Sequence, residues 1–328
     1  MTVIDFHNHV YPPEYIAAIE AGPSAYKVTY DADGNPVLNS PGDYNIAVPG
    51  HRLMDVRENV IKQAGVDRQI VSLTCPGTIL ETPARAVELS QLVNDAFAKI
   101  QREHGDHFVP LATLPLNDPQ ASVVELKRAI HQLGLKGATL FSNANGVALS
   151  DQRFWPMYEQ ANEMELTFFI HPTFPVGVEA MLNYMLMPLV GFLADTTLAA
   201  ASLVFSGVVE RFPRIRWVLG HLGGAVPYLA ERFDRGFEAY PVCRQNIDKP
   251  PSEYLKTHFY YDTVNFDVRA LQFCIDFAGV DHLVAGSDYP HLIGSMERMV
   301  SSINALSITP AEKQCILGEN AARLLGLN

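Results

Sequence analysis

The sequence contains few cysteines, and none of them forms a Cys-x-x-Cys pair. Only four occur in 328 residues, at Cys75, Cys243, Cys274 and Cys315. Scattered cysteines are typical of a protein kept in a reducing compartment, and they predict no disulfide framework. We therefore expect a cytoplasmic protein.

Positive charge is also scarce. The chain has 24 lysines and arginines against 36 aspartates and glutamates, which gives a formal net charge of -12. A surface with this balance argues against binding to nucleic acid or to an anionic membrane. A small anionic substrate remains compatible with it, because a few local arginines can override the global charge.

Long apolar runs are missing as well. The first residues lack the basic region and apolar stretch of a signal peptide. The most apolar segment, residues 180–192, is interrupted by Asn183 and Pro188 and is too short to span a membrane. Three interpretations of it stay open: a helical lid, an oligomer interface or an ordinary core helix.

Apolar residues make up 48% of the chain and charged residues 18%, a composition typical of a well-buried globular protein. Apolar strand patterns recur along the whole chain, and helical patterns follow them. Thr82-Pro83 and Asp118-Pro119 mark two helix starts, since a capping side chain before proline is favoured there. The predicted strands cover residues 3–9, 69–74, 108–114, 135–141, 166–171, 215–221, 258–263 and 282–287. The predicted helices include residues 52–64, 82–105, 118–133, 151–164, 196–211, 228–240, 267–278, 295–306 and 310–325.

This alternation predicts an α/β fold, a (β/α)8 TIM barrel formed by a single domain over residues 1–328. The strand cores are almost uninterrupted apolar runs, as in parallel sheets buried on both faces. A doubly wound open sheet is the alternative, but no glycine-rich dinucleotide loop follows the first strand. Residues 11–50 show no sustained periodicity, apart from a hairpin tip at 31–36. We interpret them as a long insertion after strand 1, over the active-site mouth.

Histidines and an aspartate stand at the ends of the predicted strands. His7 and His9 are two residues apart in the first strand, so both imidazoles face the same side. His171, His221 and Asp288 each follow another apolar strand directly. The carboxyl ends of barrel strands carry function, and imidazole is the commonest metal-binding side chain. The set therefore predicts a metal site.

These motifs resemble the amidohydrolase superfamily. More narrowly, the chain is similar to the group that contains 2-amino-3-carboxymuconate-6-semialdehyde decarboxylase, γ-resorcylate decarboxylase and 5-carboxyvanillate decarboxylase. The resemblance spans nearly the whole chain. It rests on residues 5–9 (DFHNH), 65–67 (GVD), 169–172 (FIHP), 206–213 (SGVVERFP), 220–227 (GHLGGAVP), 251–254 (PSEY) and 286–290 (GSDYP).

The resemblance implies one divalent ion, zinc or in some members manganese, held by His7, His9, His171 and Asp288. It also implies that His221 is a base or proton shuttle and no tight ligand, with Asp288 sharing the catalytic work. Many superfamily members hold two metals on a strand-four lysine. Lys136 is the only lysine near that strand, and its early position favours a surface role over a binuclear site.

Arginines bear on the substrate class. Arg232 lies eleven residues after His221, where the resemblance implies a carboxylate-binding arginine donated across a dimer interface. Arg52 is a second candidate for substrate binding, and Arg57 for an interface or helix arginine. A solvated helix arginine, paired with Glu231 or Asp234, is the alternative for Arg232.

The function predicted is a metal-dependent, non-oxidative decarboxylase, a carbon–carbon lyase acting on a small aromatic or unsaturated carboxylic acid. A hydrolase of an amide, ester or lactone is the alternative, as is a hydratase of an unsaturated dicarboxylate. A barrel that only binds or scaffolds is disfavoured by so many polar strand ends. The partners expected are a small organic acid and a second copy of the chain, in a homodimer or a dimer of dimers.

Overall fold

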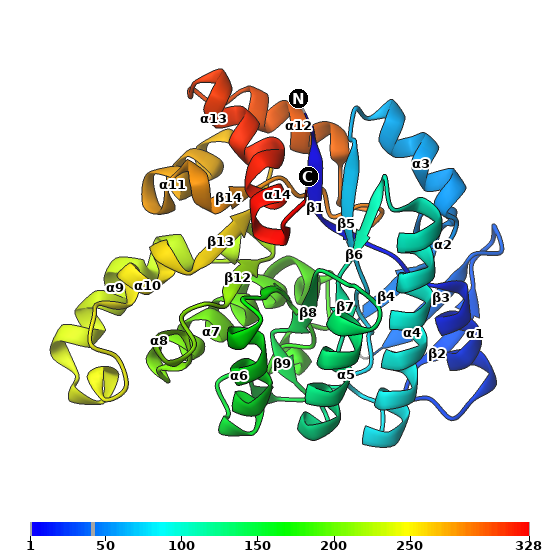
Figure 1. The fold of residues 1–328 in the computed structure, drawn as a ribbon, viewed down its shortest axis with the longest axis horizontal. Helices are drawn as coiled ribbons and strands as arrows, with labels where there is room; N and C mark the ends of the chain where they lie inside the picture. Colours follow the sequence, from blue (N-terminus) through cyan, green and yellow to red (C-terminus); the bar gives the residue numbers. More distant parts are fainter. Residues whose placement is uncertain (1, 41–42, 328) are drawn as a thin grey trace.

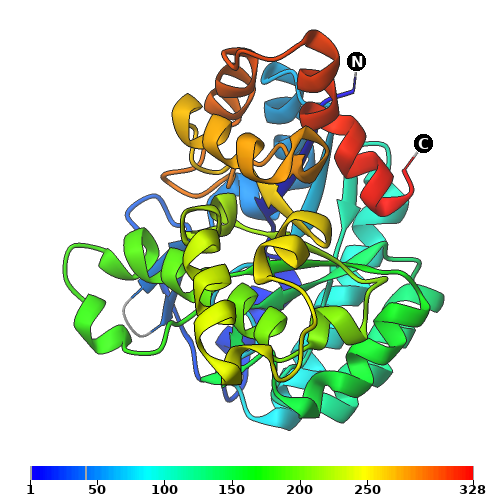
Figure 2. The same ribbon diagram turned by 90° about the vertical axis from the view of Figure 1, so that its left-hand side faces the viewer.

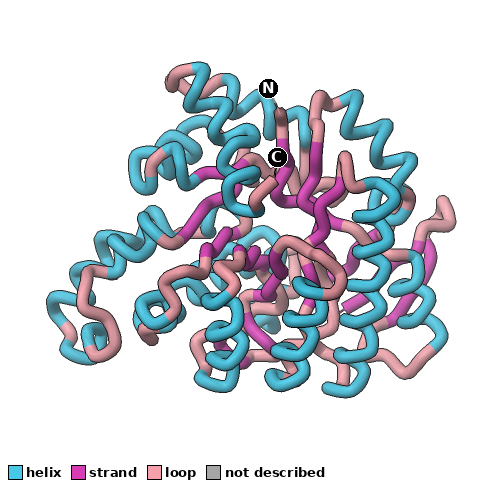
Figure 3. Tube along the Cα trace, viewed as in Figure 1, coloured by secondary structure: helices cyan, strands magenta, loops and turns pink. Residues whose placement is uncertain are grey.

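The computed structural model describes residues 2–40 and 43–327, in which parallel strands form an inner ring surrounded by helices (Figures 1 and 3). The ring consists of β1 (Ile4–His9), β5 (Arg68–Ser72), β6 (Phe108–Pro110) continued by β7 (Ala112–Thr113), β8 (Gly137–Phe141), β11 (Thr167–His171), β12 (Arg216–Leu219), β13 (Phe259–Asp262) and β14 (Leu283–Val284). The Phe6 amide donates to the Ala285 carbonyl at 2.7 Å, and the Asp288 amide donates to the His7 carbonyl at 2.8 Å. These bonds join the last strand to the first.

Helices cover the outside of the ring. The larger ones are α3 (Met54–Gln63), α4 (Pro83–His104), α5 (Pro119–His131), α6 (Trp155–Glu163), α7 (Phe192–Phe205), α9 (Val226–Ala239), α11 (Val268–Ala278) and α12 (Met296–Asn304). Shorter helices are α1 (Pro13–Ala21), α2 (Pro49–Arg52), α8 (Val208–Arg211), α10 (Pro251–Thr257), α13 (Pro310–Gln314) and α14 (Asn320–Leu325). The short pair β9 (Asn143–Ala144) and β10 (Val147–Ala148) follows β8. Both ends of the chain lie on the same side of the molecule (Figure 2).

The two predicted helix starts are confirmed. The Thr82 side chain accepts a hydrogen bond from the Arg85 amide at 3.4 Å, and Asp118 accepts one from the Ala121 amide at 3.0 Å. Each cap binds an amide that the first helical turn leaves without a partner.

Three element predictions need correction. The helix expected at 196–211 begins earlier and is split into α7 and α8 by Gly207, whose φ of 80° favours glycine. The last strand pairs with β13 only over Leu283–Val284, and the next residue, Ala285, accepts a hydrogen bond from the Phe6 amide and donates one to the Ile316 carbonyl instead. The third strand is interrupted at Leu111, between β6 and β7.

The segment after β1 has more regular structure than its sequence indicates. It contains α1 and an antiparallel sheet of β2 (Lys27–Tyr30), β3 (Pro36–Ser40) and β4 (Asp43–Ile46). The predicted hairpin tip is confirmed: the Asp31 carboxylate accepts hydrogen bonds from the Asp33 and Asn35 amides at 3.0 and 2.7 Å. Residues 41–42 of the predicted insertion lie outside the described part.

Residues 180–192 do not form an ordinary core helix. They include the end of a short helical turn at Val178–Met181 and all of another at Met187–Gly191, and Leu182, Tyr184 and Leu189 are exposed. The helical run Met187–Phe205 is long and apolar enough to cross a membrane by length and composition alone. Half of it is buried in the protein, however, and core helices meet the same criterion.

Candidate metal centre

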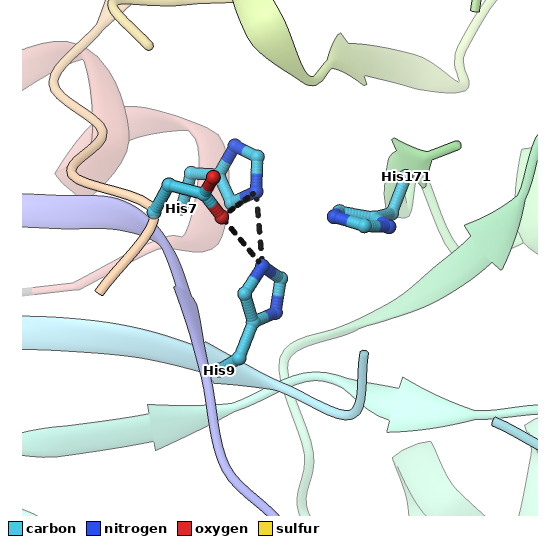
Figure 4. Close-up of side chains that lie close together, drawn as sticks. His7, His9 and His171 are labelled. Atoms are coloured by element: carbon cyan, nitrogen blue, oxygen red, sulfur yellow. Dashed lines mark hydrogen bonds and ion pairs between the residues drawn. The ribbon is translucent and has the colours of Figure 1, made fainter. Parts of the chain in front are cut away.

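Four of the predicted site residues converge at the carboxyl ends of the strands. The donor atoms of His7, His9, His171 and Asp288 all lie within 4.8 Å of one another, and all four residues are buried. Asp288 Oδ1 lies 3.4 Å from His7 Nε2 and 3.2 Å from His9 Nε2. In Figure 4 the labelled rings of His7, His9 and His171 surround one small space. We refer to these four residues as the metal cluster.

The three histidines of the metal cluster are oriented by contacts at Nδ1. His7 Nδ1 contacts a carboxylate oxygen of Asp262, and His9 Nδ1 lies 3.1 Å from Ser72 Oγ. His171 Nδ1 donates to the Pro172 carbonyl at 2.7 Å. Nδ1 is therefore occupied on each ring, which leaves Nε2 to face the centre, the arrangement that metal-binding histidines usually show.

The protonation states of the cluster suit a divalent cation. Burial lowers the pKa of His9 and His171 well below the usual value, so both rings are neutral and can offer a lone pair. Burial raises the pKa of Asp288, but contacts with His221 and His9 outweigh it and hold that pKa well below its usual range. Asp288 Oδ1 is buried and has no hydrogen-bond partner among the described residues. Against the effect of burial, Asp262 raises the pKa of His7, and a metal ion at His7 Nε2 would displace that proton. Three imidazoles with a carboxylate fit a single divalent transition metal.

His221 lies beside the metal cluster and outside it. Its Nε2 is 3.7 Å from Asp288 Oδ2, and its Nδ1 is buried without a partner in the part of the chain that is described. Lys136 is exposed and precedes β8, so it stands at the opposite end of that strand from the cluster. The structure therefore brings no strand-four lysine to this site.

Asp262 is a site residue that the sequence analysis did not identify. Besides contacting His7, its carboxylate accepts hydrogen bonds from the backbone amides of His221 and Leu222, both at 2.9 Å. It thus positions a cluster histidine and the neighbouring His221 together. The signal was present, since Asp262 stands near the end of the predicted apolar strand 258–263 and is the last residue of β13.

Arg57 is a buried structural residue. Its guanidinium donates to the carbonyls of His9 at 2.6 Å and Gly50 at 2.8 Å, and to Asn8 Oδ1 at 2.6 Å. It also lies 4.9 Å from the centre of the Tyr289 ring. Of the two roles considered for Arg57, the structure supports the helix arginine, because no part of the side chain is exposed for an interface.

The metal cluster opens into a cavity of about 290 Å³. Its polar lining includes Asn45, Thr74 and His291 beside the cluster and His221. Most of the other walls are apolar, and they are formed by Ile46, Val48, Met185, Pro188, Leu189, Phe192, Pro290, Leu292 and Ile293. Among the described residues, no lysine or arginine lines this cavity.

The structure does not bring the two predicted substrate arginines to the cavity. Arg52 donates to the Ala47 carbonyl at 2.7 Å and to Asn35 Oδ1 at 3.3 Å, so it holds the antiparallel sheet segment instead. Arg232 is exposed on α9 and forms no ion pair with the described residues, including Glu231 and Asp234. Arg232 therefore has the exposed helix position of the alternative, without its ion pair to Glu231 or Asp234.

Comparison with known proteins identifies the family. A profile of the amidohydrolase family matches residues 4–327. The 2-amino-3-carboxymuconate-6-semialdehyde decarboxylase of Dictyostelium discoideum is 35% identical over 279 residues, which cover 84% of this chain and 77% of that protein. The crystal structure of 5-carboxyvanillate decarboxylase from Sphingomonas paucimobilis has a TM-score of 0.87 at 24% identity, covering 100% of this chain and 99% of that one.

A further structure shows a ligand and a metal on the same fold. The dihydroxybenzoic acid decarboxylase of Polaromonas sp. JS666 was solved with bound manganese and the inhibitor 2-nitroresorcinol. It has a TM-score of 0.82 at 21% identity and covers 99% of this chain and 97% of its own. The chain therefore belongs to the amidohydrolase family of α/β proteins with TIM-barrel architecture. Within it, the chain groups with the metal-dependent non-oxidative decarboxylases similar to the aminocarboxymuconate-semialdehyde enzyme, which confirms the predicted resemblance.

Proposed function

We propose that this protein removes carbon dioxide, without oxidation, from a small aromatic or unsaturated carboxylic acid. The observation that carries the proposal is the metal cluster at the base of a mostly apolar cavity of about 290 Å³. Apolar walls suit a planar carbon skeleton, and a few convergent polar groups orient it. The similarity to decarboxylases over most of the chain supports the same reaction.

The cofactor proposed is one divalent ion, zinc by preference and manganese as the alternative. His7, His9, His171 and Asp288 would hold it, and three imidazoles with one carboxylate suit either ion. A divalent ion held by these residues would supply Lewis acidity towards an oxygen substituent of the substrate.

His221 and Asp288 are proposed to move the proton that replaces the carboxylate. Loss of carbon dioxide leaves an electron pair on carbon, and that carbon must gain a proton. His221 Nε2 borders the cavity 3.7 Å from Asp288 Oδ2, so the pair can exchange a proton and present it to the substrate. Asp262 fixes the backbone at His221, which gives this nitrogen a defined position.

We propose a homodimer, or a dimer of dimers, in which Arg232 reaches the cavity of the partner. An arginine fork binds a carboxylate through two hydrogen bonds, yet no described arginine of the same chain lines the cavity. Exposed apolar residues occur in two segments that contribute to the cavity wall, and a monomer would leave them in water. They include Leu182, Tyr184, Leu189, Val190, Leu292 and Ile293.

We also propose an insertion over the mouth, a single domain and a cytoplasmic location. Residues 11–50 are proposed to be an insertion that covers the mouth, supported by Asn45, Ile46 and Val48 in the cavity wall. The same cavity is lined from the segment 180–192 by Met185, Pro188 and Leu189. Residues 1–328 are proposed to form one domain, since one family profile spans almost all of them. A cytoplasmic location is proposed from the scattered cysteines, all of them free.

The experiment that tests the function measures carbon dioxide release from a panel of hydroxybenzoates and unsaturated dicarboxylates by the metal-loaded protein. Release that stops with a chelator and in His7→Ala supports the decarboxylase. Hydrolysis of amide, ester or lactone substrates without gas release would establish the hydrolase alternative. Water addition to a dicarboxylate would establish the hydratase. Binding of these acids without turnover would indicate a protein that only binds them.

A further inference from the structure

His291 lies in the cavity wall next to the metal cluster. It follows Asp288 by one tight turn, in which the His291 amide donates to the Asp288 carbonyl at 3.0 Å. The centre of its ring is 4.9 Å from that of His9, and the side chain lines the cavity. No described residue forms a hydrogen bond with its imidazole. The ring nitrogens of His291 are thus available to a molecule in the cavity.

A second histidine, His51, packs against the ring of His291. His51 is 1% exposed, and its ring packs between Tyr11, at 4.9 Å, and His291, at 5.3 Å between ring centres. Both ring nitrogens of His51 are buried without a hydrogen-bond partner in the described chain. Buried nitrogens without hydrogen-bond partners lower the stability of the folded protein. The two ring nitrogens of His51 therefore indicate that a polar group or a water molecule binds beside them.

We propose that His291, supported by His51, determines substrate specificity by binding a hydroxyl oxygen of the substrate, next to the group held at the metal cluster. The proposal rests on the proposed function, since it concerns the substrate of the same site. A neutral imidazole offers one donor and one acceptor nitrogen, which matches a hydroxyl group that also donates and accepts. No cationic side chain of the described chain competes for this position. The substrate class is therefore an unsaturated or aromatic acid that carries a hydroxyl group.

The test uses two inert probes that differ by one hydroxyl, 2-nitroresorcinol and 2-nitrophenol. The nitro group occupies the place of a carboxylate and cannot be lost, so binding is measured without turnover. Calorimetry on the metal-loaded protein should show that the wild type binds the dihydroxy probe about 10-fold more tightly, the effect of one good hydrogen bond. His291→Phe should abolish this preference, and His291→Gln, which keeps a donor and an acceptor, should retain part of it. His131→Phe, a change at an exposed histidine on α5, should retain all of it.

His51→Phe separates a supporting role from a structural one. Phenylalanine fills the same ring space without unpaired nitrogens, so the unfolding midpoint should not fall while the hydroxyl preference weakens. An unchanged preference in His51→Phe overturns the role of His51. Equal loss of affinity for both probes in His291→Phe overturns the role of His291, because that residue would then contact the shared nitro group. Failure of the proposed decarboxylation is seen separately, as absent carbon dioxide release with the hydroxyl preference intact.

Discussion

At the scale of single residues, the histidines of this protein differ by what occupies their nitrogens. Those of the metal cluster have Nδ1 bound by a carboxylate, a hydroxyl or a carbonyl, which turns Nε2 inward. His221 has no such partner on Nδ1 and is fixed through its backbone amide by Asp262. One residue type can thus serve as a metal ligand or as a proton carrier, and the second contact decides which.

His171→Ala and His221→Ala should therefore fail in different ways. His171→Ala should lose both metal and turnover, because it removes one of four converging donors. His221→Ala should keep about one ion per chain and lose turnover by on the order of 10²–10⁴-fold, as expected for a general acid–base residue. Elemental analysis and steady-state kinetics measure the two properties. A metal-free His221→Ala protein would make His221 a ligand and contradict this assignment.

At the scale of elements, the close approach of β1 and the chain after β14 sets the cluster geometry. The Asp288 and Ser287 amides both donate to the His7 carbonyl, at 2.8 and 3.1 Å. Gly286 permits this approach, since a Cβ atom there would lie 2.9 Å from His7 Cβ and 3.1 Å from Asp262 Cβ. The two segments that carry His7, His9 and Asp288 are packed without room for one methyl group.

Gly286→Ala should consequently separate β1 from the segment after β14. We expect a destabilisation of about 1–3 kcal/mol, as for other overpacked cores, together with weaker metal binding. Denaturant unfolding and a competition assay with a metal chelator measure the two effects. Gly236→Ala is the matched control: nothing lies within 4 Å of its new Cβ in α9, and alanine should stabilise that helix by about 0.5–1 kcal/mol. Equal changes in stability and in metal affinity in the two variants would contradict the close packing at Gly286.

At the scale of the whole molecule, closure of the strand ring buries many titratable groups together, which makes stability depend on pH. Burial lowers the pKa of five histidines: His9, His51, His171, His258 and His291. Each of these histidines binds fewer protons in the folded state than in the unfolded state. Its contribution to the free energy of unfolding is therefore complete above the unfolded pKa of about 6.5 and is lost as the pH falls below that pKa. Burial also raises the pKa of Asp5 and Asp43 to about 6, and these two oppose the trend only below that pH.

The unfolding midpoint of the chelator-treated protein should fall as pH is lowered from 7.5 to 6. Each histidine contributes up to about 1.4 kcal/mol per pH unit once its unfolded form is protonated. Thermal melts in matched buffers measure this change. A midpoint that rises over the same interval would mean that the raised pKa of His7, caused by Asp262 against the effect of burial, dominates.

The proposed shared site predicts complementation between two inactive variants. Arg232→Ala and His171→Ala should partly rescue each other when mixed, because a heterodimer has one site with an intact cluster and a donated arginine. With complete random exchange, about a quarter of the sites should recover in a two-fold dimer. The activity of the mixed subunits measures the rescue, and light scattering measures the oligomeric state. A monomer, or verified heterodimers without activity, would leave Arg232 as a surface residue.

Periodicity and local chemistry determined much of this protein from its sequence alone. Apolar strands buried on both faces indicated a parallel ring, and capping side chains located α4 and α5. Polar residues after strands predicted a metal site among His7, His9, His171, His221 and Asp288, and the family resemblance set His221 apart from the ligands. These signals are local, since strand direction and helix capping depend on neighbouring residues. The family resemblance added the reaction class, which no spacing rule supplies.

Only the tertiary structure decided which long-range contacts form. Asp262 is 255 residues from His7 in the chain, and the His51 ring lies 5.3 Å from that of His291, which is similarly remote in sequence, so no local pattern could pair them. The same reason explains Arg52, whose sequence position suggested a substrate contact but whose guanidinium holds the Ala47 carbonyl. Contacts between distant strand ends depend on how the ring closes, and that is a property of the folded chain as a whole.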